Sequence, residues 1–373
     1  MPRGREVVTG QLVLDDGLVA GRVLVEDDGI AAIEHDASVG DDAFVVPGYI
    51  DIHVHGWGGH DAMGGPEALS GMARALARRG VTSFLPTAVT ASMERLADFA
   101  ESVRAWTPEA PGDGAVPLGF NLEGPFLAEA RKGAHPAGLL RDPADVSDAE
   151  LAPLLDGLRV ITIAPERPGA LGLIRRLSGQ GVRVSLGHSA ADLAQARAGY
   201  EAGAVTTTHL FNAMGGVVHR DPGLALAALL DDDVWTELIA DGLHVEPALW
   251  PLIWRLKPRE RLLLVSDAIA LAGSGETRGM IGMLKVELHG DRVTLLGSDT
   301  LGGSVTALDL EVRNLVAQGA GLPDAVRAAS ANPAQLLGRV DRGRLAAGLR
   351  ADLVVLGGDL GVRRVMRAGE WVA

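Results

Sequence analysis

The sequence predicts an α/β fold: a TIM-like (β/α)8 barrel with a small β-sandwich-like domain formed from both chain termini. Two observations lead to this prediction. Eight short apolar runs alternate with helix-like stretches through the middle of the 373-residue chain, a pattern typical of parallel strands that are each followed by a helix. Both ends of the chain hold short β-rich runs separated by turn residues instead.

The eight apolar runs predict the barrel strands. They are Gly48–His53, Thr82–Pro86, Leu118–Leu122, Val160–Ile163, Arg183–Leu186, Val205–Thr208, Thr236–Ala240 and Leu262–Ser266. Eight β/α units over roughly 300 residues fit a barrel of about 250 residues with insertions. An open doubly wound sheet is the alternative. It usually has fewer strands and often a Gly-rich phosphate loop, and no GxGxxG motif opens a helix here.

Helical patterns separate most of these runs, and an extra hairpin and a helix follow the last one. The helical patterns include Ala68–Arg79, Leu171–Ser178, Ala190–Ala202 and Pro247–Leu256. The hairpin is predicted at Met283–Leu288 and Arg292–Leu296, and the helix at Val305–Ala317. Together these elements complete the barrel domain, which we expect to span residues 47–343.

The two ends of the chain are expected to form one β domain, residues 1–46 with residues 344–373. Neither end alone can bury a sheet, so we expect them to pair. The strand-like runs are Gln11–Leu14, Gly21–Val25, Gly29–Ile33, Ala351–Leu356 and Val362–Val372.

Composition excludes several kinds of function. The formal net charge of −14 argues against binding nucleic acid or an anionic membrane through bulk charge, so an anionic ligand needs a local cationic cluster. There is no cysteine, which excludes disulfides and thiolate metal ligands. No stretch approaches the length of a membrane span, and residues 1–10 lack the apolar core of a signal peptide. We therefore expect a cytoplasmic protein.

His53-Val54-His55 ends the first barrel strand and directs two imidazoles to one face, because side chains alternate along a strand. Two such imidazoles can form half of a transition-metal site, although paired strand histidines more often pack or face solvent. Other strand ends carry further potential ligands: Glu123, His188, His209, Asp241 and Asp267. Because strand ends of a barrel meet at one mouth, these side chains predict a metal centre there.

The motifs at these positions resemble the amidohydrolase superfamily and, within it, the N-acetylglucosamine-6-phosphate deacetylase family. The matching stretches run in family order: Asp51–Gly56, Leu122–Phe126, Lys132–His135, Ala164–Glu166, Gly187–Ser189, His209–Met214, Asp241–His244, Ser266–Ala268 and Asn332–Ala334. The combination of Glu-Gly-Pro-Phe, Lys-Gly-Ala-His and His-Leu-Phe-Asn-Ala-Met is far more specific than the shared His-x-His motif.

The resemblance implies a role for each site residue. Glu123, His188 and His209 match the first metal site, and His53 and His55 the second, which some family members lack. Asp267 matches the catalytic acid/base and a metal contact. Matches to sugar-phosphate and other substrate contacts are Ala134, His135, Asn212, Ala213, Arg220, His244, Leu301 and Gly302. The implied cofactor is one or two divalent ions, Zn2+ first, with Fe2+, Mn2+ or Co2+ as alternatives.

The implied reaction is hydrolysis of N-acetyl-D-glucosamine 6-phosphate to D-glucosamine 6-phosphate and acetate in amino-sugar catabolism. The implied partners are this small molecule and a second copy in a homodimer, with no nucleic acid or membrane. The alternatives are another N-acyl hydrolase of the D-aminoacylase type, a deaminase, or a non-catalytic relative. Dihydroorotase-like members use a carboxylated lysine at strand four, but the chain's lysines are only Lys132, Lys257 and Lys285.

Overall fold

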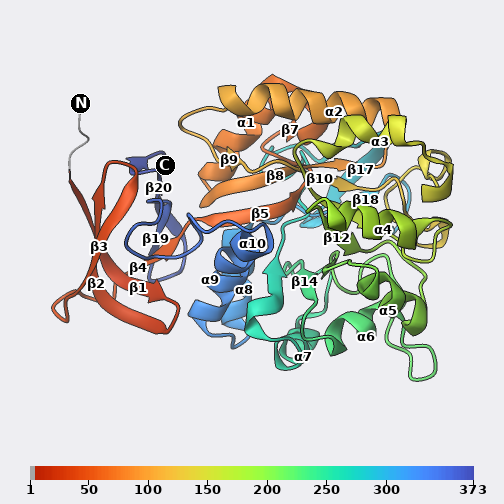
Figure 1. Cartoon of the computed structure of the whole chain (residues 1–373). Helices are drawn as coiled ribbons and strands as arrows, with labels where there is room; N and C mark the ends of the chain where they lie inside the picture. Colours follow the sequence, from red (N-terminus) through yellow and green to blue (C-terminus); the bar gives the residue numbers. More distant parts are fainter. Residues whose placement is uncertain (1–4) are drawn as a thin grey trace.

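A seven-stranded β sheet and a larger parallel sheet surrounded by helices make up the molecule (Figure 1). The computed structural model describes residues 5–373, so residues 1–4 of the predicted β domain lie outside the described part. Within residues 5–373, no helix is both long and apolar enough to cross a lipid bilayer.

The parallel sheet forms a nearly closed eight-stranded barrel, which confirms the predicted fold class. Its strands follow one another in the order of the chain: β5 (Tyr49–Val54), β8 (Val81–Val89), β10 (Phe120–Glu123), β11 (Leu158–Ile163), β12 (Arg183–Leu186), β13 (Thr206–Thr207), β14 (Trp235–Leu238) and β15 (Leu262–Leu264). All of these pairs are parallel, and the short β9 (Val116–Pro117) also pairs with β8. Each predicted apolar run overlaps one barrel strand, because strands buried on both faces are apolar throughout.

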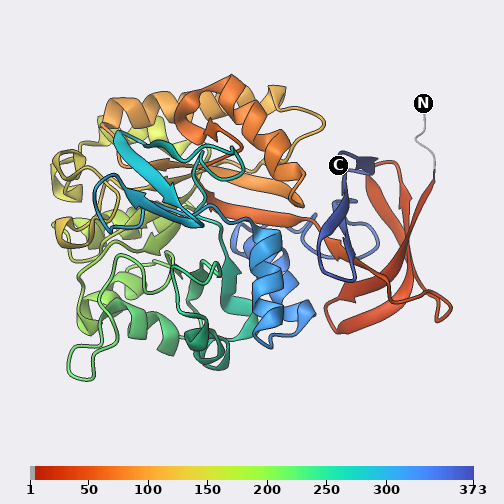
Figure 2. The same ribbon diagram turned by 180° about the vertical axis from the view of Figure 1, so that it is seen from behind.

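Helices surround the barrel on its outside (Figures 1 and 2). They are α1 (Pro66–Ala77), α2 (Met93–Trp106), α3 (Asp148–Leu155), α4 (Ala170–Gly179), α5 (Leu193–Glu201), α6 (Gly223–Leu230), α7 (Trp250–Leu256), α8 (Leu308–Ala317), α9 (Leu322–Ala329) and α10 (Ala331–Leu336). Single 3-10 turns are η1 (Ala62–Gly64), η2 (Thr107–Glu109), η3 (Glu129–Arg131), η4 (Ala137–Leu139), η5 (Pro143–Asp145), η6 (Pro247–Leu249) and η7 (Arg259–Arg261). The apolar faces of the helices pack on the strands in one large core that includes Phe84, Phe120 and Trp250.

The second sheet joins the two ends of the chain, in the strand order β21-β20-β19-β4-β1-β2-β3. Its strands are β1 (Glu6–Leu14), β2 (Gly17–Glu26), β3 (Gly29–His35), β4 (Ala43–Pro47), β19 (Leu353–Gly357), β20 (Val362–Arg367) and β21 (Glu370–Trp371). They enclose an apolar core of their own with Leu12, Val45 and Leu353. The sandwich-like architecture is confirmed, while the division of the chain at residues 46/47 and 343/344 stays a prediction.

The apolar run from Phe44 to Val54 supplies both sheets. It divides at Gly48, with β4 in the terminal sheet and β5 in the barrel. The N–H of Gly48 donates to the carbonyl of Asp352 at 2.8 Å, and a Cβ at Gly48 would lie 2.1 Å from Thr82 Oγ1. The connection therefore requires glycine because of this close approach.

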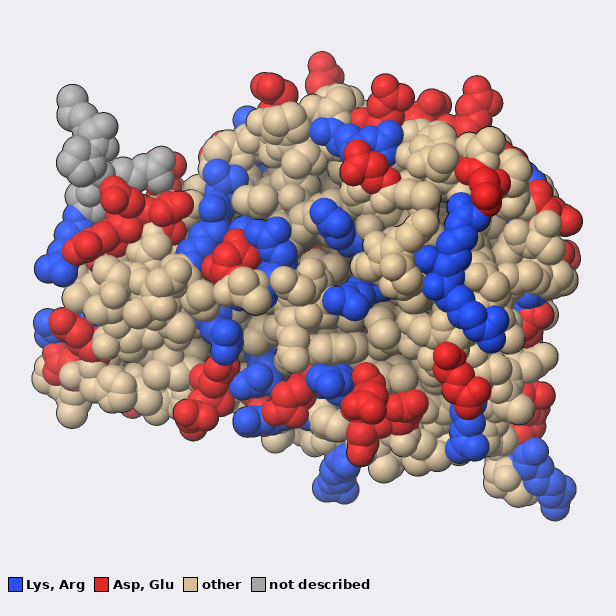
Figure 3. All heavy atoms as spheres, in the orientation of Figure 1, with Lys and Arg blue, Asp and Glu red and all other residues tan. Residues whose placement is uncertain are grey.

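Two smaller sheets lie outside the barrel. The predicted hairpin after the eighth strand is β17 (Leu284–His289) and β18 (Arg292–Leu295), and a third strand, β16 (Arg278–Ile281), extends it. The other is the pair β6 (Gly56–Trp57) and β7 (His60–Asp61), directly after the first barrel strand. On the face in Figure 3, cationic and anionic side chains are interspersed.

Candidate metal centre

The potential ligands lie together at one mouth of the barrel. His53 is the second-last residue of β5, and His55 directly follows this strand. Glu123 is the last residue of β10. The other three ligands lie just beyond the ends of β12, β13 and β15: His188, His209 and Asp267. All six are at most 7% exposed. His188, His209 and Asp267 also have positive φ angles of 47°, 28° and 48°. Such a conformation costs about 1–2 kcal/mol in a non-glycine residue. These backbone conformations thus lower the stability of the folded protein and direct the three side chains into the barrel mouth.

Glu123 lies at the centre of the first ligand group. Its Oε1 lies 2.9 Å from Nε2 of His188 and 2.9 Å from Nε2 of His209, and the two nitrogens lie 3.1 Å apart. Ligands about 2.0–2.1 Å from a tetrahedral Zn2+ lie about 3.3 Å from one another. These three atoms are therefore spaced like ligands that share one small cation.

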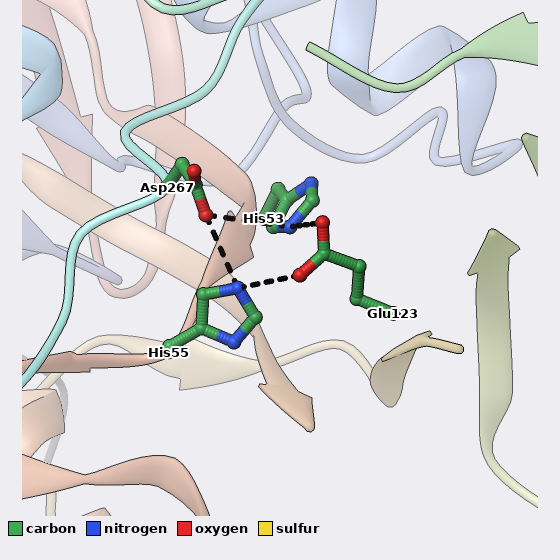
Figure 4. Close-up of side chains that lie close together, drawn as sticks. All are labelled: His53, His55, Glu123 and Asp267. Atoms are coloured by element: carbon green, nitrogen blue, oxygen red, sulfur yellow. Dashed lines mark ion pairs between the residues drawn. The ribbon is translucent and has the colours of Figure 1, made fainter. Parts of the chain in front are cut away.

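A second group faces the other side of Glu123. Ligand atoms of His53, His55, Glu123 and Asp267 all lie within 4.8 Å of one another. His55 Nε2 lies 3.2 Å from Glu123 Oε2 and 3.1 Å from Asp267 Oδ1, and His53 Nε2 lies 3.6 Å from an oxygen of each carboxylate. Figure 4 shows both imidazoles turned toward the two carboxylates.

The second group fits a divalent cation. Nε2 of His53 and Nε2 of His55 are buried and make no hydrogen bond within residues 5–373. A buried polar atom without a hydrogen-bond partner lowers the stability of the folded protein. A cation that binds both nitrogens would give them a partner and would offset the negative charge of the two carboxylates. Imidazole nitrogen and carboxylate oxygen are ligands that suit Zn2+ and its first-row neighbours.

The electrostatics of the cluster favour positive charge. Burial alone would lower the pKa of His53 and His55, but the carboxylates outweigh it: Glu123 helps to raise the pKa of His53 well above its usual range, and Asp267 with Glu123 raises the pKa of His55 to about 9. Neighbouring histidines hold the pKa of Glu123 well below its usual range, although burial opposes this. For His188, burial prevails and lowers the pKa to about 4, which leaves this ring neutral and able to bind a metal.

A cavity of about 340 Å³ opens from this cluster. Of the predicted substrate contacts, six line it: Ala134, His135, Asn212, Ala213, His244 and Leu301. Gly302 is not on its wall, although Leu301 and Gly303 are, and Arg220 is exposed on the β13–α6 loop away from the wall.

Among the described residues that line the cavity, Arg131 is the only lysine or arginine. It ends η3, in the loop after β10. The sequence does not mark Arg131 as a phosphate contact, because the loop has no periodic pattern and a surface arginine carries no signal of its own. Its place on the wall depends on the path of the loop, which the structure supplies.

The two histidines on the cavity wall are held in different ways. The N–H of Thr90 donates to His135 Nδ1 at 3.3 Å, so a neutral His135 carries its proton on Nε2 and can donate it. His244 Nδ1 instead lies 2.7 Å from Asp241 Oδ2, and two backbone N–H groups hold the other oxygen of that carboxylate. A neutral His244 therefore has its proton on Nδ1 and an acceptor at Nε2.

Comparison with known proteins places this chain in a family. Residues 44–372 match the Amidohydrolase family. N-acetylgalactosamine-6-phosphate deacetylase from Escherichia coli O157:H7 is 40% identical over 368 residues, 96% of this chain and 94% of the relative. N-acetylglucosamine-6-phosphate deacetylase from Bos taurus is 40% identical over 346 residues, 88% of this chain and 83% of the relative.

A solved structure agrees with these matches. It is a variant of N-acetyl-D-glucosamine-6-phosphate deacetylase from Mycobacterium smegmatis in complex with N-acetyl-D-glucosamine-6-phosphate. Its TM-score is 0.91 at 37% sequence identity, with 100% of both chains covered. The chain therefore belongs to the amidohydrolase family and, within it, to the N-acetylglucosamine-6-phosphate deacetylase family.

Proposed function

We propose that this protein hydrolyses the N-acetyl group of N-acetyl-D-glucosamine 6-phosphate, giving D-glucosamine 6-phosphate and acetate. The observation that carries the proposal is the buried cluster around Glu123, with Asp267 beside it and a cavity of about 340 Å³ above it. Two relatives at 40% identity over most of the chain, one named for N-acetylglucosamine 6-phosphate and the other for N-acetylgalactosamine 6-phosphate, supply the substrate class.

An amide resists hydrolysis because water is a weak nucleophile and an amine is a poor leaving group. Glu123, His188 and His209 would hold one divalent ion, and His53, His55, Glu123 and Asp267 a second. Such an ion acts as a Lewis acid toward the acetyl carbonyl and the attacking water. Zn2+ is our first choice, with Fe2+, Mn2+ or Co2+ as alternatives, because histidine and carboxylate ligands accept all four.

Asp267 is the proposed acid/base. Burial would raise its pKa, but His55, whose Nε2 lies 3.1 Å from Asp267 Oδ1, and the charge of His53 lower the pKa below its usual value. Asp267 is therefore an anion at neutral pH. It can take a proton from the attacking water and then deliver it to the amine nitrogen as the C–N bond breaks.

His135 is the proposed donor to the acetyl carbonyl oxygen. Its Nε2–H faces the cluster, 3.2 Å from Glu123 Oε2, and can stabilise the negative charge that develops on that oxygen. His244 has an acceptor at Nε2 in its neutral form, which suits a sugar hydroxyl better than a carbonyl. The two tautomers therefore favour His135 as the donor to the carbonyl oxygen and His244 as the acceptor for a sugar hydroxyl.

Arg131 is the proposed cation for the phosphate within one chain, because it is one of the residues that line the cavity. A guanidinium binds a phosphate with two parallel hydrogen bonds. Contact of Arg220 and Gly302 with the substrate stays a prediction. The homodimer and the cytoplasmic location also stay predictions.

N-acetyl-D-galactosamine 6-phosphate is a second candidate substrate, since a relative named for that sugar covers 96% of the chain. The test is to measure initial rates with both sugar phosphates and with unphosphorylated N-acetylglucosamine, on protein of known metal content. We expect N-acetyl-D-glucosamine 6-phosphate to be hydrolysed fastest. The unphosphorylated sugar should have a kcat/KM about 10- to 100-fold lower, the value of one charged hydrogen bond. Release of acetate from none of the three by metal-loaded protein would refute the proposal.

A further inference from the structure

Glu237 is a buried carboxylate that has no role in the site described so far. It lies on β14 and is 0% exposed. Its Oε2 lies 3.1 Å from His53 Nδ1 and accepts the backbone N–H of His209 at 3.2 Å. Its backbone carbonyl accepts the N–H of Leu210 at 2.8 Å. One side chain thus contacts a residue of each predicted metal site.

The contact with Glu237 determines which nitrogen of His53 faces the cluster. A carboxylate oxygen at Nδ1 requires a proton on that nitrogen, so Nε2 presents its lone pair. Nε2 is the atom that lies 3.6 Å from Glu123 and from Asp267 without a hydrogen bond. His53 is therefore held with its ligand atom directed into the second group, as Figure 4 shows.

The other histidines of the cluster lack such a carboxylate at Nδ1. His55 Nδ1 lies 3.1 Å from the carbonyl of Thr87, and His188 Nδ1 lies 2.9 Å from the carbonyl of Arg131. His209 Nδ1 has no hydrogen-bond partner among the described residues. A carboxylate is a stronger acceptor than a carbonyl and makes the imidazole a better ligand. Among the described residues, the second group thus has a carboxylate at Nδ1 of one of its histidines, and the first group has none.

We propose that Glu237 is a positioning residue that orients His53 and thereby lets a second divalent ion bind beside Glu123, His55 and Asp267. This inference rests on the proposed metal dependence and adds to it a residue that governs how many ions bind. Glu237 touches no substrate, since it lies behind His53 and does not line the cavity.

The experiment is a Co2+ titration of metal-free protein, followed by visible absorption and by metal analysis. Three single variants and one double variant are compared with the wild type. The single variants are Glu237→Gln, His53→Gln and, as a matched control, Thr236→Val, and the double variant combines Glu237→Gln with His53→Gln. Thr236 is buried next to Glu237 on β14, and its hydroxyl has no hydrogen-bond partner among residues 5–373. Substrate is absent, so failure of the proposed reaction cannot alter the result.

We expect the wild type and Thr236→Val to bind two Co2+ ions. Glu237→Gln should weaken the second ion by about 10- to 100-fold, the usual effect of losing such a support, and leave the first ion and the melting temperature nearly unchanged. In the His53→Gln background, Glu237→Gln should have no further effect on Co2+ binding, because the orientation of His53 no longer matters. Uptake of a single ion by the wild type, equal weakening of both ions, or an undiminished effect of Glu237→Gln without His53 would overturn the proposal.

Discussion

The backbone N–H of Asp267 donates to the backbone carbonyl of His53 at 2.9 Å. This hydrogen bond, with that from His55 N–H to the carbonyl of Ala268 at 2.8 Å, joins the eighth strand end to the first at the barrel mouth. The closure of the barrel therefore also sets the distance between the proposed acid/base and the histidine pair. Fold and site share the same contacts, because strand ends converge at one face of a barrel.

Asp267→Asn should abolish most of the turnover and keep the first ion. The amide has nearly the same size but cannot accept and return a proton, so we expect kcat to fall by about 10²- to 10⁴-fold. Glu123, His188 and His209 are untouched by the change, so metal analysis should still find an ion. Asp291→Asn, on the exposed turn between β17 and β18, serves as the control and should keep full activity. Near-wild-type turnover of Asp267→Asn would remove the residue from the chemistry.

Arg131→Ala should raise KM for the phosphorylated sugar about 10- to 100-fold, because a charged hydrogen bond to phosphate is lost. KM for unphosphorylated N-acetylglucosamine should change little. Arg220→Ala is the comparison: the sequence predicts the same effect, whereas the structure leaves Arg220 off the cavity wall, so we expect a smaller one. Equal effects on the two sugars would exclude the altered arginine from phosphate binding.

Glu311→Gln should stabilise the protein increasingly as the pH rises. Glu311 on α8 is 0% exposed, both of its carboxylate oxygens lack hydrogen-bond partners among the described residues, and burial, with the charges of Asp241 and Asp51, raises its pKa well above the usual value. The unfolded chain releases this proton at about pH 4.3, while the folded protein keeps it to higher pH. The wild type therefore loses stability as the pH rises from there through the folded-state pKa, by at most about 1.4 kcal/mol per pH unit.

Melting temperatures of the wild type and of Glu311→Gln between pH 5 and 9 test this prediction. The exposed Glu101 on α2 offers a matched control, because Glu101→Gln should shift the curve little at any pH. A difference between wild type and Glu311→Gln that stays constant with pH would show that Glu311 is already ionised in the folded protein.

Removal of the metal by a chelator should abolish activity and lower the melting temperature. An ion that binds only the folded state, at 1,000 times its Kd, stabilises that state by about 4 kcal/mol. Re-addition of Zn2+ or Co2+ should restore both properties, and the restored melting temperature should also appear in Asp267→Asn, which keeps the first ligand group. Activity and melting temperature that both survive complete chelation would argue against metal dependence.

The barrel could be predicted from the sequence because parallel strands buried on both faces are continuous apolar runs. The sequence does not mark β4 as a strand of its own, because β4 and β5 share the run from Phe44 to Val54 and only Gly48 lies between them. β16 has an exposed face, with Arg278 and Met280 both open to solvent, and so no apolar run marks it. Composition and periodicity indicate which segments are buried, and they do not identify a strand that is exposed to solvent.

The ligands could be predicted for a similar reason, since strand ends in a barrel must meet. Glu237 could not be predicted as part of the site. It lies within an apolar strand, and the sequence does not reveal that its side chain contacts His53, 184 residues away. Arg131 and Arg220 lie in loops, whose paths follow from many tertiary contacts rather than from a local pattern. The sequence therefore predicts the centre of the site better than its supports and its rim.

Metal-dependent hydrolysis is tested by one measurement of product formation from N-acetyl-D-glucosamine 6-phosphate with metal-free and metal-loaded protein. We expect equal amounts of acetate and D-glucosamine 6-phosphate from the metal-loaded protein and neither product from the metal-free protein. No acetate from protein that metal analysis shows to be loaded, or the same rate without metal, would contradict it.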